Sequence, residues 1–302
     1  MNNLRVLVTG ASGFVGMPLV KHLQAKGCKV LAISRNHSPD EDVSLISWLK
    51  ADISDPKTYR EKIELFQPEV VIHLAWQGIP DYSFNTSIKN LNNSLEFLSF
   101  VAHISSCKKI LVSGSCWEFN ITQGECLESI IGSPKDDFTW AKHALRSFLE
   151  MICQQEKIIL GWLRLFYVYG PRQRTASLIP YMLNQIRKRE FPAIRTPNDA
   201  SDFIFIDDVV DAFSVATVNK IPAGIFNIGT GKSTSVLEVF RYAEGIVHNE
   251  DFLTKQLEIE SQDRPSLVNF WAGTKITIER LGWEPKTPLQ DGISKTWDYI
   301  NH

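Results

Sequence analysis

Apolar runs alternate with amphipathic stretches through the first half of the chain. Five runs are mostly apolar, as expected for strands that are covered on both faces: residues 4–9, 29–34, 70–75, 109–114 and 158–165. Between them, apolar side chains recur at helical spacing, at Val15, Leu19, Val20 and Leu23 and again at Leu91, Leu95, Leu98 and Val101. This alternation predicts an α/β fold with a doubly wound parallel sheet.

A longer helix is predicted over residues 137–155. Its inward face is expected to carry Trp140, Ala144, Leu145, Phe148 and Ile152. Beyond Tyr167 the regular alternation ends, and segments rich in Pro, Arg, Asn and Gly separate short strand-like and helical pieces. The pattern of the second half therefore predicts a smaller C-terminal lobe that is formed by several separate segments of the chain.

Composition and charge exclude several classes of protein. The chain has 302 residues, 44% of them hydrophobic and 22% charged, which is enough for one large α/β domain with or without an appendage. A net charge of −2 argues against nucleic acid as a partner. No apolar window is long enough for a membrane span and no leader pattern precedes the first strand, so we expect a cytoplasmic protein.

The five cysteines contain no CxxC pair, which predicts reduced and mostly buried thiols. The acidic segment 202–211 alternates as a short strand that enters a helix, and we expect no metal there or elsewhere. His73 ends a buried strand and is expected to be a packed core residue.

A glycine-rich loop follows the first strand directly and leads into a helix. Glycines permit a tight turn and close backbone approach, while the start of a helix directs N–H groups at a pyrophosphate. The residues predicted to hold a dinucleotide are Gly10, Ser12, Gly13, Phe14, Val15 and Gly16.

The second strand ends in Ser34 and Arg35, where an acidic residue would bind the adenosine ribose of NAD. A hydroxyl and a guanidinium suit a 2′-phosphate instead, so NADP(H) is favoured over NAD(H). The alternative for Arg35 is an ordinary solvated surface arginine.

The whole pattern resembles the extended short-chain dehydrogenase/reductase family of nucleotide-sugar epimerases, dehydratases and ketoreductases. The landmarks are TGASGFVG from residue 9, HLAW from 73, SGSC from 113, LRLFYVYGPRQ from 163, DFIFIDDVVDA from 202 and FNIGTGKSTSVLEV from 226. The resemblance implies a Rossmann domain over residues 1–166, joined by 202–228. It assigns most of 167–302 to a lobe that binds a nucleotide-diphosphate sugar, and helices near 83–103 and 137–155 to a homodimer interface.

The resemblance also implies roles for individual residues. Asp52 and Ile53 would contact adenine, and Leu74 and Ala75 would line the dinucleotide. Ser115 would be the catalytic hydroxyl, unless it is only a turn hydroxyl, and Lys142 would bind the nicotinamide ribose and lower the pKa of a catalytic tyrosine four residues earlier.

Phenylalanine, Phe138, stands at that tyrosine position. The ring can preserve the pocket, but it supplies no proton. Three explanations stay open: an engineered replacement of tyrosine, a natural variant that uses another acid such as Glu118, Tyr167 or a water relay, and a non-catalytic NADP-binding protein.

Ser34 and Arg35, as an NADPH site, favour a ketoreductase, and the resemblance implies the 4-keto group of a 6-deoxy nucleotide sugar as its target. The acidic pair of the dehydratases is absent, since Cys116 and Trp117 follow Ser115. An epimerase is the nearest rival, and an NADP-binding sensor or scaffold is the rival of another class.

Candidate substrate contacts lie in both halves of the chain. They are Trp76, with Gln77 and Tyr82 beside it, Glu118, Tyr167, Arg172, Arg174 and Arg264. The arginines suit a diphosphate. Two positions depart from the family pattern: Tyr167 replaces the usual asparagine and Ser201 the usual arginine, with Arg195 a possible substitute.

Overall fold

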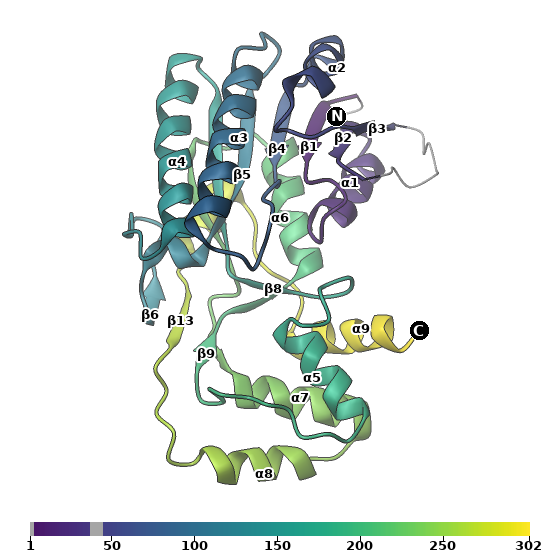
Figure 1. Cartoon of the computed structure of the whole chain (residues 1–302), viewed down its shortest axis with the longest axis vertical. Coiled ribbons are helices and arrows are strands. Elements are labelled where there is room, and N and C mark those ends of the chain that lie inside the picture. The colour runs from purple at the N-terminus through teal and green to yellow at the C-terminus, as the bar shows by residue number, and fades with distance from the viewer. Residues whose placement is uncertain (1–2, 37–44) are drawn as a thin grey trace.

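A parallel sheet organises the first half of the molecule (Figure 1). The computed structural model describes residues 3–36 and 45–302. Within them, seven strands lie in the order β11-β7-β5-β4-β1-β2-β3, and all neighbours are parallel. Their bounds are β1 Arg5–Thr9, β2 Lys29–Ser34, β3 Ile46–Lys50, β4 Val70–His73, β5 Lys109–Ser115, β7 Ile159–Leu165 and β11 Gly224–Ile228. The predicted doubly wound α/β fold is confirmed.

Helices cover both faces of this sheet because its strands are apolar on both faces. In β1, Val6 and Val8 pack into one apolar cluster with helices α1 (Gly16–Ala25) and α6 (Ile206–Val218). Leu7 points the other way, into a second cluster with α2 (Arg60–Phe66), α3 (Phe84–Ala102) and α4 (Asp137–Gln155). Because successive side chains of a strand point to opposite faces, β1 contributes to the hydrophobic cores on both sides of the sheet.

Helix α4 has the bounds predicted for it, but one residue of its inward face was predicted wrongly. Asp136 caps its start by accepting a hydrogen bond from the backbone N–H of Thr139 at 2.8 Å. The buried stripe runs through Ala141, Leu145 and Leu149. Trp140 is 40% exposed because it lies about 100° around the helix from this stripe.

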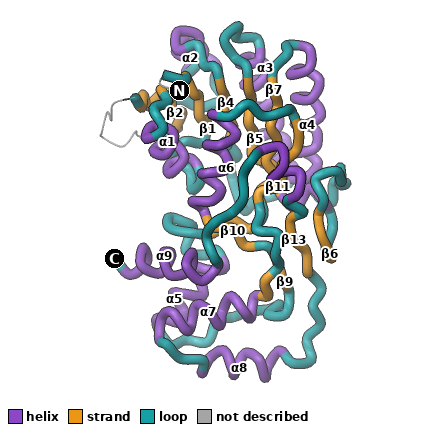
Figure 2. The backbone as a smooth tube through the Cα atoms, turned by 180° about the vertical axis from the view of Figure 1, so that it is seen from behind, coloured by secondary structure: helices purple, strands orange, loops and turns teal. Residues whose placement is uncertain are grey.

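The C-terminal lobe lies beyond the carboxyl ends of the sheet strands (Figures 1 and 2). Strand β8 (Tyr167–Tyr169) pairs with β10 (Phe203–Phe205). A four-stranded sheet contains β12 (Thr234–Ser235), β9 (Ala200–Ser201), β13 (Asn269–Ala272) and β6 (Gln123–Cys126). The helices of the lobe are α5 (Leu178–Arg187), α7 (Val236–His248), α8 (Phe252–Ser261) and α9 (Leu289–Asn301). Three short helical segments complete the described part of the chain: η1 (Pro56–Thr58), η2 (Cys116–Phe119) and η3 (Thr277–Leu281).

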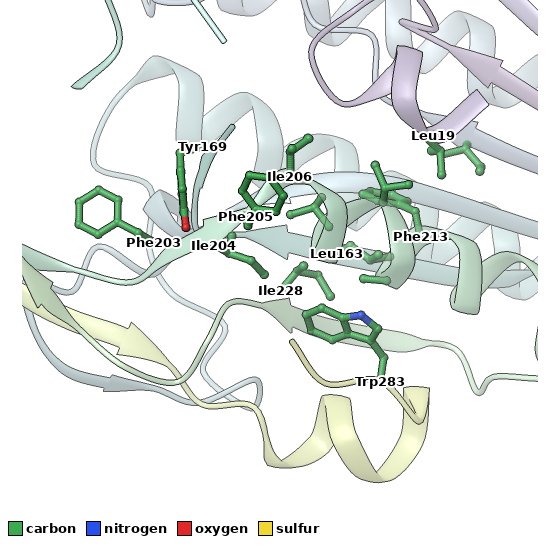
Figure 3. Packing of buried hydrophobic residues seen from close by; sticks show 14 of the residues in the cluster. Leu19, Leu163, Tyr169, Phe203, Ile204, Phe205, Ile206, Phe213, Ile228 and Trp283 are labelled. Atoms are coloured by element: carbon green, nitrogen blue, oxygen red, sulfur yellow. The ribbon is translucent and has the colours of Figure 1, made fainter. Parts of the chain in front are cut away.

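One apolar cluster connects the two halves. Figure 3 shows it extending from Leu19 and Phe213, on helices that cover the sheet, to Tyr169 and Phe203 in the strands of the lobe. The chain also returns from β10 through α6 to β11, at the edge of the main sheet. Shared packing and repeated crossing therefore hold the lobe in place against the carboxyl edge of the sheet.

The cysteines are buried free thiols: Cys28, Cys107, Cys116, Cys126 and Cys153. Across residues 3–36 and 45–302, each helix is too short or too polar to cross a membrane.

Candidate functional site

A cavity of about 680 Å³ lies at the carboxyl edge of the sheet. Its wall comes from the loops after β1, β2, β4, β5 and β7, and from helix α4. In an open parallel sheet, this edge is where ligands bind. The predicted site residues that line it are Gly10, Gly13, Phe14, Val15, Gly16, Arg35, Leu74, Trp76, Ser115, Phe138, Lys142, Tyr167, Arg172 and Arg174.

The glycine loop forms the part of the wall that suits a pyrophosphate. Gly10 has a φ of +67°, and a Cβ on it would lie 2.9 Å from backbone atoms of Leu74 and Ala75. The Ala75 N–H donates to the hydroxyl of Thr9 at 3.3 Å, which ties the two strand ends together. Helix α1 begins at Gly16, which lines the cavity, so the positive end of the helix dipole lies at the cavity wall, where it favours an anion.

The two residues at the end of β2 lie differently from each other. Ser34 is buried, and its hydroxyl donates to that of Ser12 at 2.8 Å. Arg35 is exposed and lines the cavity. The guanidinium can therefore reach a phosphate at the cavity mouth, while the Ser34 hydroxyl supports the glycine loop.

The pair predicted to contact adenine follows β3. The carboxylate of Asp52 accepts hydrogen bonds from the N–H and hydroxyl of Ser54, at 2.9 and 2.8 Å. The side chain of Ile53 is buried in the core beneath helix α2. Neither residue is part of the cavity wall.

Ser115 and Lys142 are brought together from β5 and α4. The hydroxyl of Ser115 accepts the N–H of Trp117 at 3.2 Å, which leaves its own hydrogen to donate into the cavity. The ammonium of Lys142 donates to the Ser113 carbonyl at 2.9 Å and lies 4.1 Å from the ring centre of Trp76. Burial lowers the pKa of Lys142 to about 8.

Phe138 is 6% exposed and is enclosed by aromatic rings. Its ring centre lies 5.4 Å from Trp76, 5.1 Å from Tyr82 and 6.4 Å from Trp117. Edge-to-face and tilted arrangements such as these stabilise aromatic packing. The ring that replaces the expected phenol is thus part of an aromatic wall.

The prediction that Glu118 contacts substrate or acts as an acid is wrong. Its carboxylate is fully buried and lies outside the cavity wall. It accepts the Ser115 N–H at 2.7 Å and the indole N–H of Trp162 at 3.0 Å. Arg164 at 3.4 Å and Arg146 at 3.6 Å supply its counter-charge. A carboxylate held in this way supports the turn that carries Ser115.

A second cavity, of about 570 Å³, lies in the C-terminal lobe. It adjoins the first, because Tyr167, Val168, Gln173 and Ser177 line both. Arg195 and Ser201 also line it. Arg264 is not in its wall; the guanidinium lies 3.4 Å from the carbonyl oxygens of Ile194 and Arg195, and so supports the loop that carries Arg195.

Two expectations about polar residues outside the cavity are confirmed. His73 is 1% exposed and hydrogen-bonds to Thr9 and Ser94. Burial lowers its pKa to about 3. The segment 202–211 forms strand β10 and the start of α6, and Asp202 accepts N–H groups of Thr230, Gly231 and Ala272.

Sequence reasoning missed the buried ion cluster around Glu118, although one signal was available. Arg164 interrupts an otherwise apolar strand, and a charge in such a strand requires a buried partner. Gln173, which lines both cavities, was also missed, because nothing in its neighbourhood distinguishes it from a loop glutamine.

The chain is similar to several known proteins. The profile of the "NAD dependent epimerase/dehydratase family" matches residues 6–229. A UDP-glucose 4-epimerase of Mycolicibacterium smegmatis is 28% identical, over 99% of this chain and 99% of its own length. A dTDP-4-dehydro-6-deoxyglucose reductase of Escherichia coli is 24% identical, over 96% of this chain and 95% of its own. The crystal structure of a UDP-glucose 4-epimerase from Thermotoga maritima, with UDP-glucose, has a TM-score of 0.83 at 24% identity and covers 98% of both chains. That likeness bears on the fold alone.

Proposed function

Because the chain belongs to the NAD dependent epimerase/dehydratase family, we propose that it reduces the 4-keto group of a 6-deoxy nucleotide sugar with NADPH. The observation that carries this proposal is the chemistry of the cavity wall. Ser115 and Lys142 lie beside the glycine loop, whereas no aspartate or glutamate is among the described residues that line the cavity. Elimination of water needs a side-chain acid and a base, but ketone reduction needs one proton donor beside the hydride.

Arg35 supports NADPH as the reductant. It lies at the cavity mouth, at the end of the strand that follows the glycine loop. A guanidinium there forms charge-assisted hydrogen bonds to a 2′-phosphate. NADPH would be consumed and replaced, in contrast to the retained cofactor of an epimerase.

The two adjoining cavities support a nucleotide-linked substrate. In this arrangement the nicotinamide end of the cofactor and the sugar lie in the first cavity, near Ser115, and the nucleoside lies in the second, near Arg195. Arg172 and Arg174 line the first cavity close to the shared wall and are the proposed contacts of the diphosphate. The relative from Escherichia coli, itself named a reductase of a dTDP-linked 6-deoxy keto sugar, supports the same substrate class.

A nucleotide-sugar 4-epimerase is the second candidate. The observation that favours it is the 28% identity to a UDP-glucose 4-epimerase over nearly the whole of both chains. An epimerase oxidises and then reduces the same carbon, so net consumption of NADPH separates the two reactions.

The test is to incubate the protein with NADPH and a panel of 4-keto-6-deoxy nucleotide sugars, and to follow loss of reduced cofactor and formation of the alcohol. The wild-type chain and Phe138→Tyr are compared. Stoichiometric oxidation of NADPH is expected. Exchange of sugar epimers without net oxidation would replace the proposal by the epimerase. Cofactor binding without turnover in either form would leave the non-catalytic NADP-binding protein.

A further inference from the structure

A reductase with phenylalanine at position 138 lacks the phenol that would protonate the new alkoxide. The following inference rests on the proposed function and concerns the source of that proton. Phe138 cannot supply it, and the Glu118 carboxylate is held by Ser115, Trp162 and two arginines outside the cavity. The donor must therefore be another group in the cavity wall or water.

Four side chains of the described residues of that wall, apart from arginines, ionise in the accessible pH range: Tyr82, Cys116, Lys142 and Tyr167. Cys116 is 5% exposed in an apolar cluster, and burial raises the pKa of its thiol. The ammonium of Lys142 is held by the Ser113 carbonyl and the face of Trp76. The ring of Tyr167 packs against Phe203 and Phe270 of the C-terminal lobe, at 5.8 and 6.1 Å between ring centres, and its hydroxyl accepts the indole N–H of Trp117 at 3.2 Å.

Tyr82 differs from these three. Its ring lies 5.1 Å from that of Phe138 and 5.1 Å from that of Trp117. Its hydroxyl forms no hydrogen bond within residues 3–36 and 45–302, although the residue is half-buried in the cavity wall. Tyr82 therefore places a phenol next to Phe138, the position where the family has its catalytic tyrosine, and its hydroxyl proton is not donated to any described protein group.

The segment that carries Tyr82 is well anchored. It joins β4 to α3 along the edge of the sheet that faces the C-terminal lobe (Figure 1). Asn90 holds its beginning by accepting the Gln77 N–H at 2.7 Å and donating to the Gln77 carbonyl at 3.0 Å. Arg174 donates to the Ile79 carbonyl at 2.9 Å. These contacts fix the backbone on which the phenol is placed, as a catalytic group requires.

We propose that Tyr82 is the general acid of this site and supplies the phenolic proton that Phe138 lacks. Hydride leaves the reduced nicotinamide and forms a C–H bond at the keto carbon while the C=O π bond breaks. The phenolic O–H breaks and its proton forms the new hydroxyl on the former keto oxygen. NADPH becomes NADP⁺, and the Tyr82 phenolate takes a proton from water before the next turnover.

The surroundings of Tyr82 keep its hydroxyl protonated near neutral pH. Burial raises the pKa of Tyr82, with Asp136 acting in the same direction and the cationic Arg174 opposing it. An acid must be protonated to act, so turnover should fall as pH rises through the pKa of Tyr82. Lys142, with a pKa of about 8, titrates first, so the part of the alkaline limb of kcat that lies above that pH reports on Tyr82.

The experiment compares wild type, Tyr82→Phe, the double variant Tyr82→Phe with Phe138→Tyr, and Tyr299→Phe as a matched control. Tyr299 is a 53% exposed tyrosine of α9, so its hydroxyl should not affect turnover. Tyr82→Phe should lower kcat by about 10²- to 10⁴-fold, the effect of a positioned acid, with KM changed little. The double variant should recover turnover, because Phe138→Tyr returns a phenol to the neighbouring position.

Three results would overturn the assignment: turnover of Tyr82→Phe close to wild type, a rise in KM alone, or an alkaline limb unchanged by the substitution. Tyr82→Phe removes one oxygen that has no protein partner, and NADPH binding checks that the variant is folded. Fluorinated tyrosine at position 82 gives a second measurement, because its lower phenol pKa should move the alkaline limb to lower pH. Failure of the proposed function is distinguishable, since the wild-type chain itself would then turn over no keto sugar.

Discussion

Replacing Glu118 by glutamine tests whether the buried ion cluster beneath Ser115 is structural. The carboxylate is fully buried and faces two guanidiniums, of Arg146 and Arg164, at 3.6 and 3.4 Å. Glutamine keeps the size and one acceptor oxygen, but removes the charge that both arginines need. Breaking a buried ion pair from one side costs about 3–5 kcal/mol. We expect Glu118→Gln to lower the free energy of unfolding by that amount.

Glu150 provides a matched control within the same cluster. It lies 3.6 Å from Arg146, the same distance as Glu118, but its side chain is 57% exposed. Pairs with an exposed partner contribute about 0–1 kcal/mol. Glu150→Gln should therefore be nearly neutral in urea unfolding followed by circular dichroism. If the two variants lose the same free energy of unfolding, or if both are neutral, burial of the Glu118 charge is not what stabilises this turn.

Three further predictions concern separate parts of the molecule. Lys109 donates to the carbonyls of Ala216, Thr217 and Asn219 at 2.6–3.0 Å, so Lys109→Met should lower the free energy of unfolding by about 2 kcal/mol. Lys108→Met, at an exposed position, is the control. Equal losses in the two variants would contradict the role of these hydrogen bonds. The pKa of His73 falls from 6.5 to about 3 on folding, so the unfolded state binds the proton more readily and stability should drop as pH falls below 6.5. The drop is at most about 1.4 kcal/mol per pH unit, His73→Gln should flatten it in denaturant titrations, and parallel curves would refute the assignment. Arg35→Ser should raise the Kd for NADPH by about 10- to 100-fold in fluorescence titrations while leaving that for NADH unchanged, and equal weakening of both would show that Arg35 does not select the phosphate.

Much of the first half of the chain was predictable because its signals are local. Residues close together in the sequence produce both the buried strand β2, through its apolar run, and helix α4, through its amphipathic spacing and its cap at Asp136. The glycine loop is equally local: Gly10 needs its positive φ in order to pass close to Leu74 and Ala75.

Other features depend on where distant segments meet. Trp140 continues a helical stripe with Ala144, Phe148 and Ile152, but only Trp140 is exposed, so the sequence pattern alone does not show where burial along the helix begins. Glu118 has the chemistry of an acid in the sequence, but its position between Arg146 and Arg164 makes it a structural counter-ion. No periodicity encodes such long-range contacts.

The sequence by itself determined the alternation of strands and helices in the first half, the glycine loop after the first strand and the presence of Ser115 and Lys142. The sequence also showed that position 138, where a catalytic tyrosine was expected, is phenylalanine. Only the tertiary structure placed the ring of Tyr82 beside that position, because the segment after β4 and helix α4 are far apart in sequence and meet at the carboxyl edge of the sheet. Residue types and spacing determine which chemistry is available, whereas packing decides which groups face the same cavity.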